Sequence, residues 1–179
     1  MDVQTVMQQV FELASYTPAN SLQFYGFLFL LGSFTVASLS DIKRMAAQKE
    51  FAEVWLVFIA AVFLYDFYRI SEIHVGFFAV KWLSIGLFAL LSWRYIGLVL
   101  SLSQMDVTAA CAVMSLLSPL LIVVYYFLLV FFNILLKPIL KRFGDGISMP
   151  FMPVVFAATV VMLMIARLPD VLTALKALT

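Results

Sequence analysis

The chain has 179 residues, of which 65% are hydrophobic and 12% are charged, and its formal net charge is +1. With a mean hydropathy of +1.09, it is far more apolar than an average soluble domain. This composition excludes a soluble globular enzyme, gives no reason to expect nucleic acid as a partner, and predicts an integral membrane protein in contact with lipid. Cys111 is the single cysteine, which excludes an internal disulfide and a cysteine-based metal cluster.

Residues 1–19 (MDVQTVMQQVFELASYTPA) form the first segment. They contain Asp2 and Glu12 but no lysine or arginine, and they lack the long apolar stretch of a signal peptide. We expect them to form a short amphipathic helix on the membrane surface, followed by one transmembrane domain over residues 20–179.

Six apolar runs, separated by polar or helix-breaking residues, predict an all-α, polytopic membrane protein. Spanning a hydrocarbon core of roughly 30 Å takes about 20 mostly apolar residues. We place the spans near residues 22–40, 52–70, 75–93, 107–118, 120–137 and 150–168. The fourth run reaches only about 18 Å as a helix, so we expect a half-span that starts at depth in the bilayer.

An alternative count joins residues 107–136 into one helix kinked at Pro119 and gives five spans. Basic residues favour one of the two counts, because cytoplasmic loops are enriched in lysine and arginine. With six spans and the N-terminus outside, seven basic residues face the cytoplasm (Lys43, Arg44, Lys49, Arg94, Lys137, Lys141 and Arg142) and three face the outside (Arg69, Arg167 and Lys176). The five-span count gives a weaker bias of six to four, so we favour six spans.

Ionisable side chains at membrane depth are expensive and mark either function or a paired structural role. The candidates are Asp41, Asp66, Lys81 and Asp106. Asp66 precedes Arg69 by three residues, so we expect the two to pair on one helix face near the outer interface. Lys81 lies about two turns from the outer end of its helix, and we expect its long side chain to reach toward water.

Asp41 and Asp106 both lie at cytoplasmic helix ends in the six-span topology. If the first and fourth helices pack together, the two carboxyls can meet, and a close pair cannot both ionise cheaply. One then holds a proton while the other acts as a base on water, as in aspartic proteases, with no cofactor or metal. For Asp106 a structural role as a helix N-cap is the alternative, and the two roles do not exclude each other.

Three stretches resemble motifs of the prepilin and preflagellin peptidases, which are intramembrane aspartic proteases. Residues 41–44 (DIKR) resemble the start of the family's first motif, D-I-K-x-R-x-I-P-N, and residues 106–119 (DVTAACAVMSLLSP) resemble its second motif with the apolar helix that follows. Residues 149–158 (MPFMPVVFAA) resemble the P-F-x-P segment that opens the family's last helix. The resemblance spans roughly residues 22–165 in the family's order.

The resemblance implies an endopeptidase of the inner membrane that uses Asp41 and Asp106 as its catalytic pair. Its implied partner is a pilin-like or flagellin-like precursor, from which it removes a short basic leader at the cytoplasmic face. The sequence departs from the family pattern at residues 103–105 (SQM), where glycines are usual, at Thr108 in place of lysine, and at residues 46–47 (AA). It is identified as a divergent member of the family, or as one that has lost activity.

Two other constellations offer alternatives. The stretch RFGDGIS, with Asp145, and the LYD at residues 64–66 imitate the motif pair of presenilin-like proteases, but the topology separates Asp66 from Asp145. A Gly-Asp-Gly turn is the better interpretation. The rival to a peptidase is a non-catalytic homologue that holds a pilin-like partner, or a small membrane carrier that uses Asp66 and Lys81 along a polar path.

Overall fold

The computed structural model describes residues 21–44, 49–70, 75–92, 103–143 and 150–178, and of residues 21–22, 43–44, 49, 143 and 167–178 it describes the backbone alone. These ranges hold helices and no strands, so the all-α prediction is confirmed for them. The helices are α2 (Ser21–Arg44), α3 (Lys49–Tyr68), α4 (Val75–Leu91), α6 (Gln104–Ser115), α7 (Pro119–Leu140) and α8 (Met152–Leu178), and a short 3-10 helix, η2 (Lys141–Phe143), follows α7. The expected amphipathic segment 1–19 lies outside the described residues.

Three of these helices are long and apolar enough to cross a membrane, over Gln23–Ile42, Glu50–Tyr68 and Pro119–Leu140. Val75–Leu91 and Met152–Ala166 are shorter apolar helices. Large apolar side chains such as Leu28, Val57, Leu83 and Phe127 are exposed on the outer faces of α2, α3, α4 and α7. Apolar surface on this scale is unfavourable in water and suits lipid, which supports a membrane protein.

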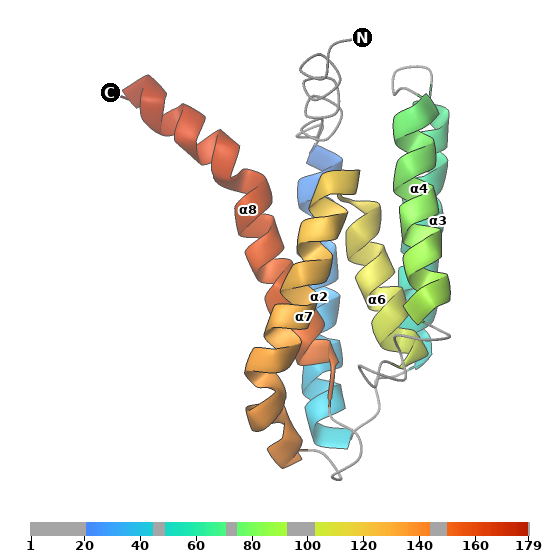
Figure 1. Cartoon of the computed structure of the whole chain (residues 1–179), viewed down its shortest axis with the longest axis vertical. Helices are drawn as coiled ribbons and strands as arrows, with labels where there is room; N and C mark the ends of the chain where they lie inside the picture. The colour runs from blue at the N-terminus through green and yellow to red at the C-terminus, as the bar shows by residue number, and fades with distance from the viewer. Residues whose placement is uncertain (1–20, 45–48, 71–74, 93–102, 144–149, 179) are drawn as a thin grey trace.

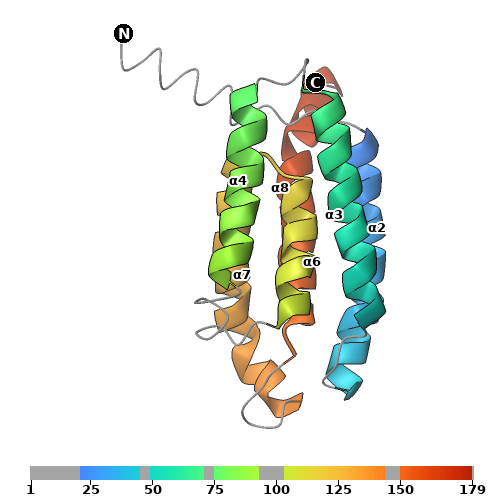
Figure 2. The ribbon, with the colours of Figure 1, turned by 90° about the vertical axis from the view of Figure 1, so that its right-hand side faces the viewer.

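α6 is the central helix of the bundle and contacts each of the other five helices (Figure 2). It has twelve residues, and nine of them are buried. Ala109, Ala110 and Ala112 let the neighbouring backbones approach closely, because small side chains keep helices near one another. The shortest of the six predicted runs therefore forms the most enclosed helix.

α6 and α7 are separate helices, so the prediction of a break is confirmed and the single kinked helix over residues 107–136 is wrong. Leu116 closes α6, and Ser118 is the N-cap of α7, where its side chain accepts from the backbone N–H of Leu121 at 3.4 Å. Pro119 occupies the first turn of α7, where its missing N–H costs nothing. Gln23 of α2 donates to the Leu116 carbonyl at 2.5 Å, which satisfies a backbone group freed by the break.

α8 is longer than the sequence predicts. It continues to Leu178, whereas the predicted run ends at residue 168. Pro169 removes one backbone hydrogen bond, which bends a helix without always ending it. Figure 1 shows the C-terminal part of α8 leaning away from the other helices.

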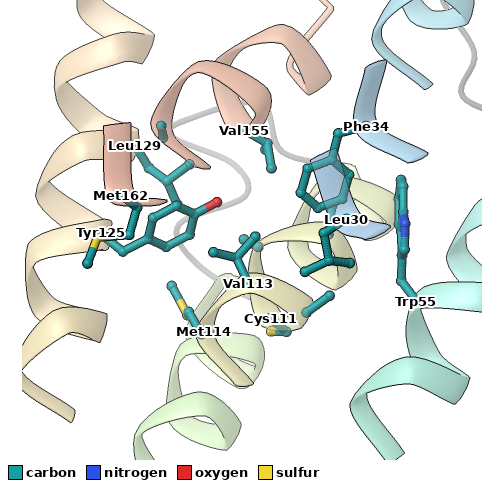
Figure 3. Packing of buried hydrophobic residues seen from close by; sticks show 14 of the residues in the cluster. Leu30, Phe34, Trp55, Cys111, Val113, Met114, Tyr125, Leu129, Val155 and Met162 are labelled. Atoms are coloured by element: carbon teal, nitrogen blue, oxygen red, sulfur yellow. The ribbon is translucent and has the colours of Figure 1, made fainter. Parts of the chain in front are cut away.

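The first part of α8 packs against both α2 and α7. In Figure 3, Val155 of α8 has Tyr125 and Leu129 of α7 on one side and Leu30 and Phe34 of α2 on the other. The Tyr125 hydroxyl lies 3.2 Å from Thr159 Oγ1, a buried hydrogen bond that fixes the register of α7 against α8. α8 therefore closes the bundle between α2 and α7.

Candidate functional site

Asp41 lies near the C-terminal end of α2, and its side chain is buried. Its Oδ2 accepts a hydrogen bond from the backbone N–H of Met152 at 3.2 Å, at the start of α8. A carboxylate in this place satisfies a donor that the helix leaves open and interacts favourably with the helix dipole. Asp41 is thus an N-terminal cap for α8, supplied by a different helix.

Asp106 lies in the first turn of α6 and forms a capping box with Ser103. The Ser103 hydroxyl and backbone N–H both donate to Asp106 Oδ2, at 2.7 and 2.8 Å, while the Asp106 N–H donates to Ser103 Oγ at 3.3 Å. The expectation that Asp106 itself is the N-cap is wrong by three residues, since Ser103 holds that position. The reason is that the reciprocal pair satisfies two open backbone donors, whereas a lone aspartate satisfies one.

The charge of Asp41 acts electrostatically on the carboxyl of Asp106. Burial raises the pKa of Asp106 from 3.8 to about 6, the hydrogen bonds from Ser103 lower it, and the nearby charge of Asp41 raises it further. The C-terminal end of α2 and the first turns of α6 and α8 lie in the same half of the bundle (Figure 1). The pKa of Asp106 is therefore raised toward neutral pH beside a second carboxyl, an arrangement that suits acid–base chemistry on water.

Asp66 and Lys81 form a buried ion pair between α3 and α4. Lys81 Nζ lies 2.7 Å from Asp66 Oδ2, and Trp82 Nε1 donates to the same oxygen at 3.1 Å. The predicted Asp66–Arg69 pair and the predicted reach of Lys81 toward water are both wrong. Arg69 instead donates to the Tyr65 hydroxyl and stacks over its ring. Asp66 pairs with Lys81 of the next helix rather than with Arg69, its neighbour in sequence, because burial favours the closest charge-assisted pair.

Some predicted features lie outside the described residues: the Gly-Asp-Gly turn with Asp145 and the pair Ala46-Ala47. The segment that resembles P-F-x-P does open the last helix, since α8 begins at Met152 with Pro153 in its first turn. Among the described residues, no three histidine, cysteine, aspartate or glutamate side chains gather as a metal site would need.

Sequence reasoning missed three polar side chains at this end of the bundle. Ser103 has a sequence signal, since serine followed three residues later by an acid, ahead of an apolar run, is a capping box pattern. Asn133 interrupts the apolar run of α7, and an amide inside such a run marks a buried polar contact. Ser38 has no signal of this kind, because serine is common in membrane helices.

Comparison of the chain with protein-family models, with curated proteins and with solved structures finds no match. The interpretation of the site therefore depends on its own geometry and on the resemblance of its motifs.

Proposed function

We propose that this protein is an intramembrane aspartic endopeptidase with Asp41 and Asp106 as its catalytic pair. One observation carries the proposal: the carboxyls of Asp41 in α2 and Asp106 in α6 are both buried, and burial together with the charge of Asp41 raises the pKa of Asp106 to about 6. Such a pair keeps one proton between two acids, the arrangement that aspartic proteases use. We assign the roles of acid and base to the pair rather than to either residue, because the two carboxyls of such a dyad titrate together.

The reaction needs only the pair, a water and a peptide bond. The ionised carboxylate takes a proton from the water, whose oxygen attacks the peptide carbonyl, while the protonated carboxyl donates to the carbonyl oxygen. Collapse of the tetrahedral intermediate breaks the C–N bond, and the amine leaves with a proton returned from the pair. The products are a carboxylate on the leader and a free N-terminus on the apolar helix.

The proposed substrate is a pilin-like or flagellin-like precursor with a short basic leader. In the proposed topology the six helices place the N-terminus outside and the Asp41 end of the bundle at the cytoplasmic face of the inner membrane, as a multi-pass protein. Lys137 and Lys141 at the end of α7 and in η2 lie at that same end, in line with the cytoplasmic excess of basic residues (Figure 1). A leader–helix junction sits at this height in the bilayer.

A non-catalytic homologue is the second candidate, and a specific observation favours it. Asp41 caps α8, and Asp106 belongs to a capping box, so each carboxyl has a structural role that needs no catalysis. A membrane carrier has less support, because Asp66 and Lys81 are bonded to each other.

Co-expression with candidate precursors tests the proposal. Asp41→Asn and Asp106→Asn should each abolish cleavage, because an amide cannot exchange the proton. Asparagine still offers an oxygen to the Met152 N–H or to Ser103, so both variants should remain in the membrane at wild-type level. Asp145→Asn is the matched control and should cleave normally. Cleavage that survives in either dyad variant would refute the mechanism, and a wild-type chain inactive on every precursor would favour the non-catalytic homologue.

A further inference from the structure

Three exposed basic side chains lie together at the C-terminal end of α7. Lys137 is in the last turn of the helix, and Lys141 and Arg142 belong to η2, which continues it. The ion pair found among the described residues is Lys81–Asp66, so no described carboxylate neutralises these three charges. This basic cluster (Lys137, Lys141 and Arg142) therefore presents its positive charge to the surroundings of the bundle.

The basic cluster begins where the apolar part of α7 ends. From Pro119 to Leu136 the helix advances about 27 Å, close to the roughly 30 Å of a hydrocarbon core. Figure 1 and Figure 2 both show the end of α7 and η2 reaching past the first turns of α6 and α8. When α7 spans a bilayer, the three charges therefore lie at the level of the lipid headgroups.

Exposed apolar side chains border the basic cluster along α7. Ile134 lies three residues before Lys137 and seven before Lys141, so the three share one face of the helix. Ile134 is 68% exposed, and Leu135 beside it is 53% exposed. Leu140, by contrast, is 5% exposed and belongs to the core, so it holds this last turn against the bundle. The surface of α7 thus passes from apolar to basic within about two turns and is anchored by a buried leucine.

Pro138 leaves a hydrogen-bond acceptor at the same place. It lies inside α7, and its ring nitrogen carries no N–H to donate to the carbonyl of Ile134, the partner of that position in a regular helix. Helix carbonyls point toward the C-terminal end of the helix. The Ile134 carbonyl therefore lacks its usual donor and is directed toward the level of the basic cluster.

This combination fits the headgroup of an anionic phospholipid. An arginine guanidinium binds two phosphate oxygens in one plane, and a lysine ammonium adds a compact charge. A zwitterionic headgroup carries its own cation beside the phosphate, whereas an anionic headgroup leaves lysines and arginines of the protein to balance the charge. The bordering apolar side chains distinguish a lipid from a soluble anion, because acyl chains cover them and a soluble anion leaves them exposed.

We propose that the basic cluster binds the phosphate of an anionic phospholipid whose acyl chains lie along Ile134 and Leu135, with a headgroup hydroxyl donating to the Ile134 carbonyl. The bound lipid ties the end of α7 to the bilayer. The proposal does not depend on peptidase activity, because none of these residues belongs to the Asp41–Asp106 pair.

Lipid retention tests the proposal. The full chain is purified in a mild neutral detergent and mixed with phosphatidylglycerol or phosphatidylcholine of the same acyl chains, and native mass spectrometry counts the lipids that stay bound. The wild type should retain phosphatidylglycerol in preference to phosphatidylcholine. Each of Lys137→Gln, Lys141→Gln and Arg142→Gln should weaken this preference about 5-fold, the value of one basic residue near an anionic headgroup, and the triple variant should lose it.

Two control variants isolate the charge and its place. Lys141→Arg keeps the charge and should keep the preference for phosphatidylglycerol. Arg69→Gln removes one positive charge at the opposite end of the bundle, where Arg69 donates to the Tyr65 hydroxyl, and should also keep the preference. Glycerol 1-phosphate, which has the phosphate but no acyl chains, should not displace the bound phosphatidylglycerol.

Melting temperatures separate lipid binding from a structural role. Basic side chains at a helix C-terminus also stabilise the helix through its dipole, and that contribution does not depend on the added lipid. Phosphatidylglycerol should raise the melting temperature of the wild type more than phosphatidylcholine does, whereas the two lipids should act equally on the triple variant. A triple variant that melts lower but keeps the wild-type difference between the two lipids would assign the basic cluster to helix stability and overturn the proposal.

The remaining outcomes identify the ligand. A wild type that retains both lipids equally, or a triple variant that still prefers phosphatidylglycerol, refutes the lipid site. Displacement of phosphatidylglycerol by glycerol 1-phosphate would mean a site for soluble anions instead. A poly-glutamate peptide that binds the wild type through the same residues, without a preference among the lipids, would assign the surface to an acidic polypeptide and overturn the proposal.

Discussion

The buried ion pair between α3 and α4 gives the sharpest stability prediction. Lys81 and Asp66 lie 2.7 Å apart, and their side chains are 9% and 13% exposed. Replacing one partner leaves the other charge buried, which typically costs about 3 to 5 kcal/mol. For Lys81→Met we expect the lower end, about 3 kcal/mol, because Trp82 still donates to Asp66 at 3.1 Å. Asp66→Leu should cost about 3 to 5 kcal/mol, because Lys81 then has no anion beside it among the described residues.

The double replacement should reverse most of that loss. With Asp66→Leu and Lys81→Met together, two apolar side chains occupy the site beside Phe63 and Phe78, which pack against Trp82. Buried pairs replaced by apolar residues of similar size are often neutral or stabilising, so the double variant should unfold within about 1 kcal/mol of the wild type. The single losses would then be strongly non-additive.

The assay is equilibrium unfolding in mild detergent by titration with a denaturing detergent, monitored by far-UV circular dichroism. It is applied to the wild type, to the two single variants and to the double variant. Lys137→Met is the matched control, because Lys137 is exposed at the end of α7, and it should change stability by less than about 0.5 kcal/mol. Single replacements that cost under about 1 kcal/mol, or a double variant that loses the sum of the two, would refute the reasoning.

Two further predictions concern α2 and α6. The free energy of unfolding should fall by about 3 kcal/mol as pH rises from about 4 to 6, because the folded Asp106, with its pKa raised to about 6, keeps a proton that the unfolded group releases near 3.8. Asp106→Asn should flatten this pH dependence. A free energy of unfolding that rises over that range would contradict the prediction. Gly26→Leu should lower the free energy of unfolding by about 1 to 3 kcal/mol, because even a Cβ at this position would lie 3.0 Å from the Leu116 methyls. Gly32→Leu is the control, because a Cβ there meets nothing within 4 Å, and it should be neutral or stabilising in the same unfolding assay.

The amino-acid sequence by itself determines the class of the protein and the positions of its helices. Hydropathy depends on local composition, so it predicts the helices and the apolar faces that α2, α3 and α7 expose. The break between α6 and α7 is local too, since Ser118 and Pro119 cap and start a helix in any surroundings. The capping box of Ser103 and Asp106 is also predictable from the sequence, because a serine followed three residues later by an acid is its local pattern. The prediction that Asp106 is the N-cap is wrong because it leaves out Ser103, which holds that position.

Only the tertiary structure decided which polar groups meet. Local spacing paired Asp66 with Arg69, but packing of α3 on α4 brings Lys81 to 2.7 Å, and burial makes that distance decisive. Asp41 caps a helix that begins 111 positions later in the chain, a contact with no local signal. The enclosure of α6 has the same origin, because a helix becomes central when five others pack around its small side chains.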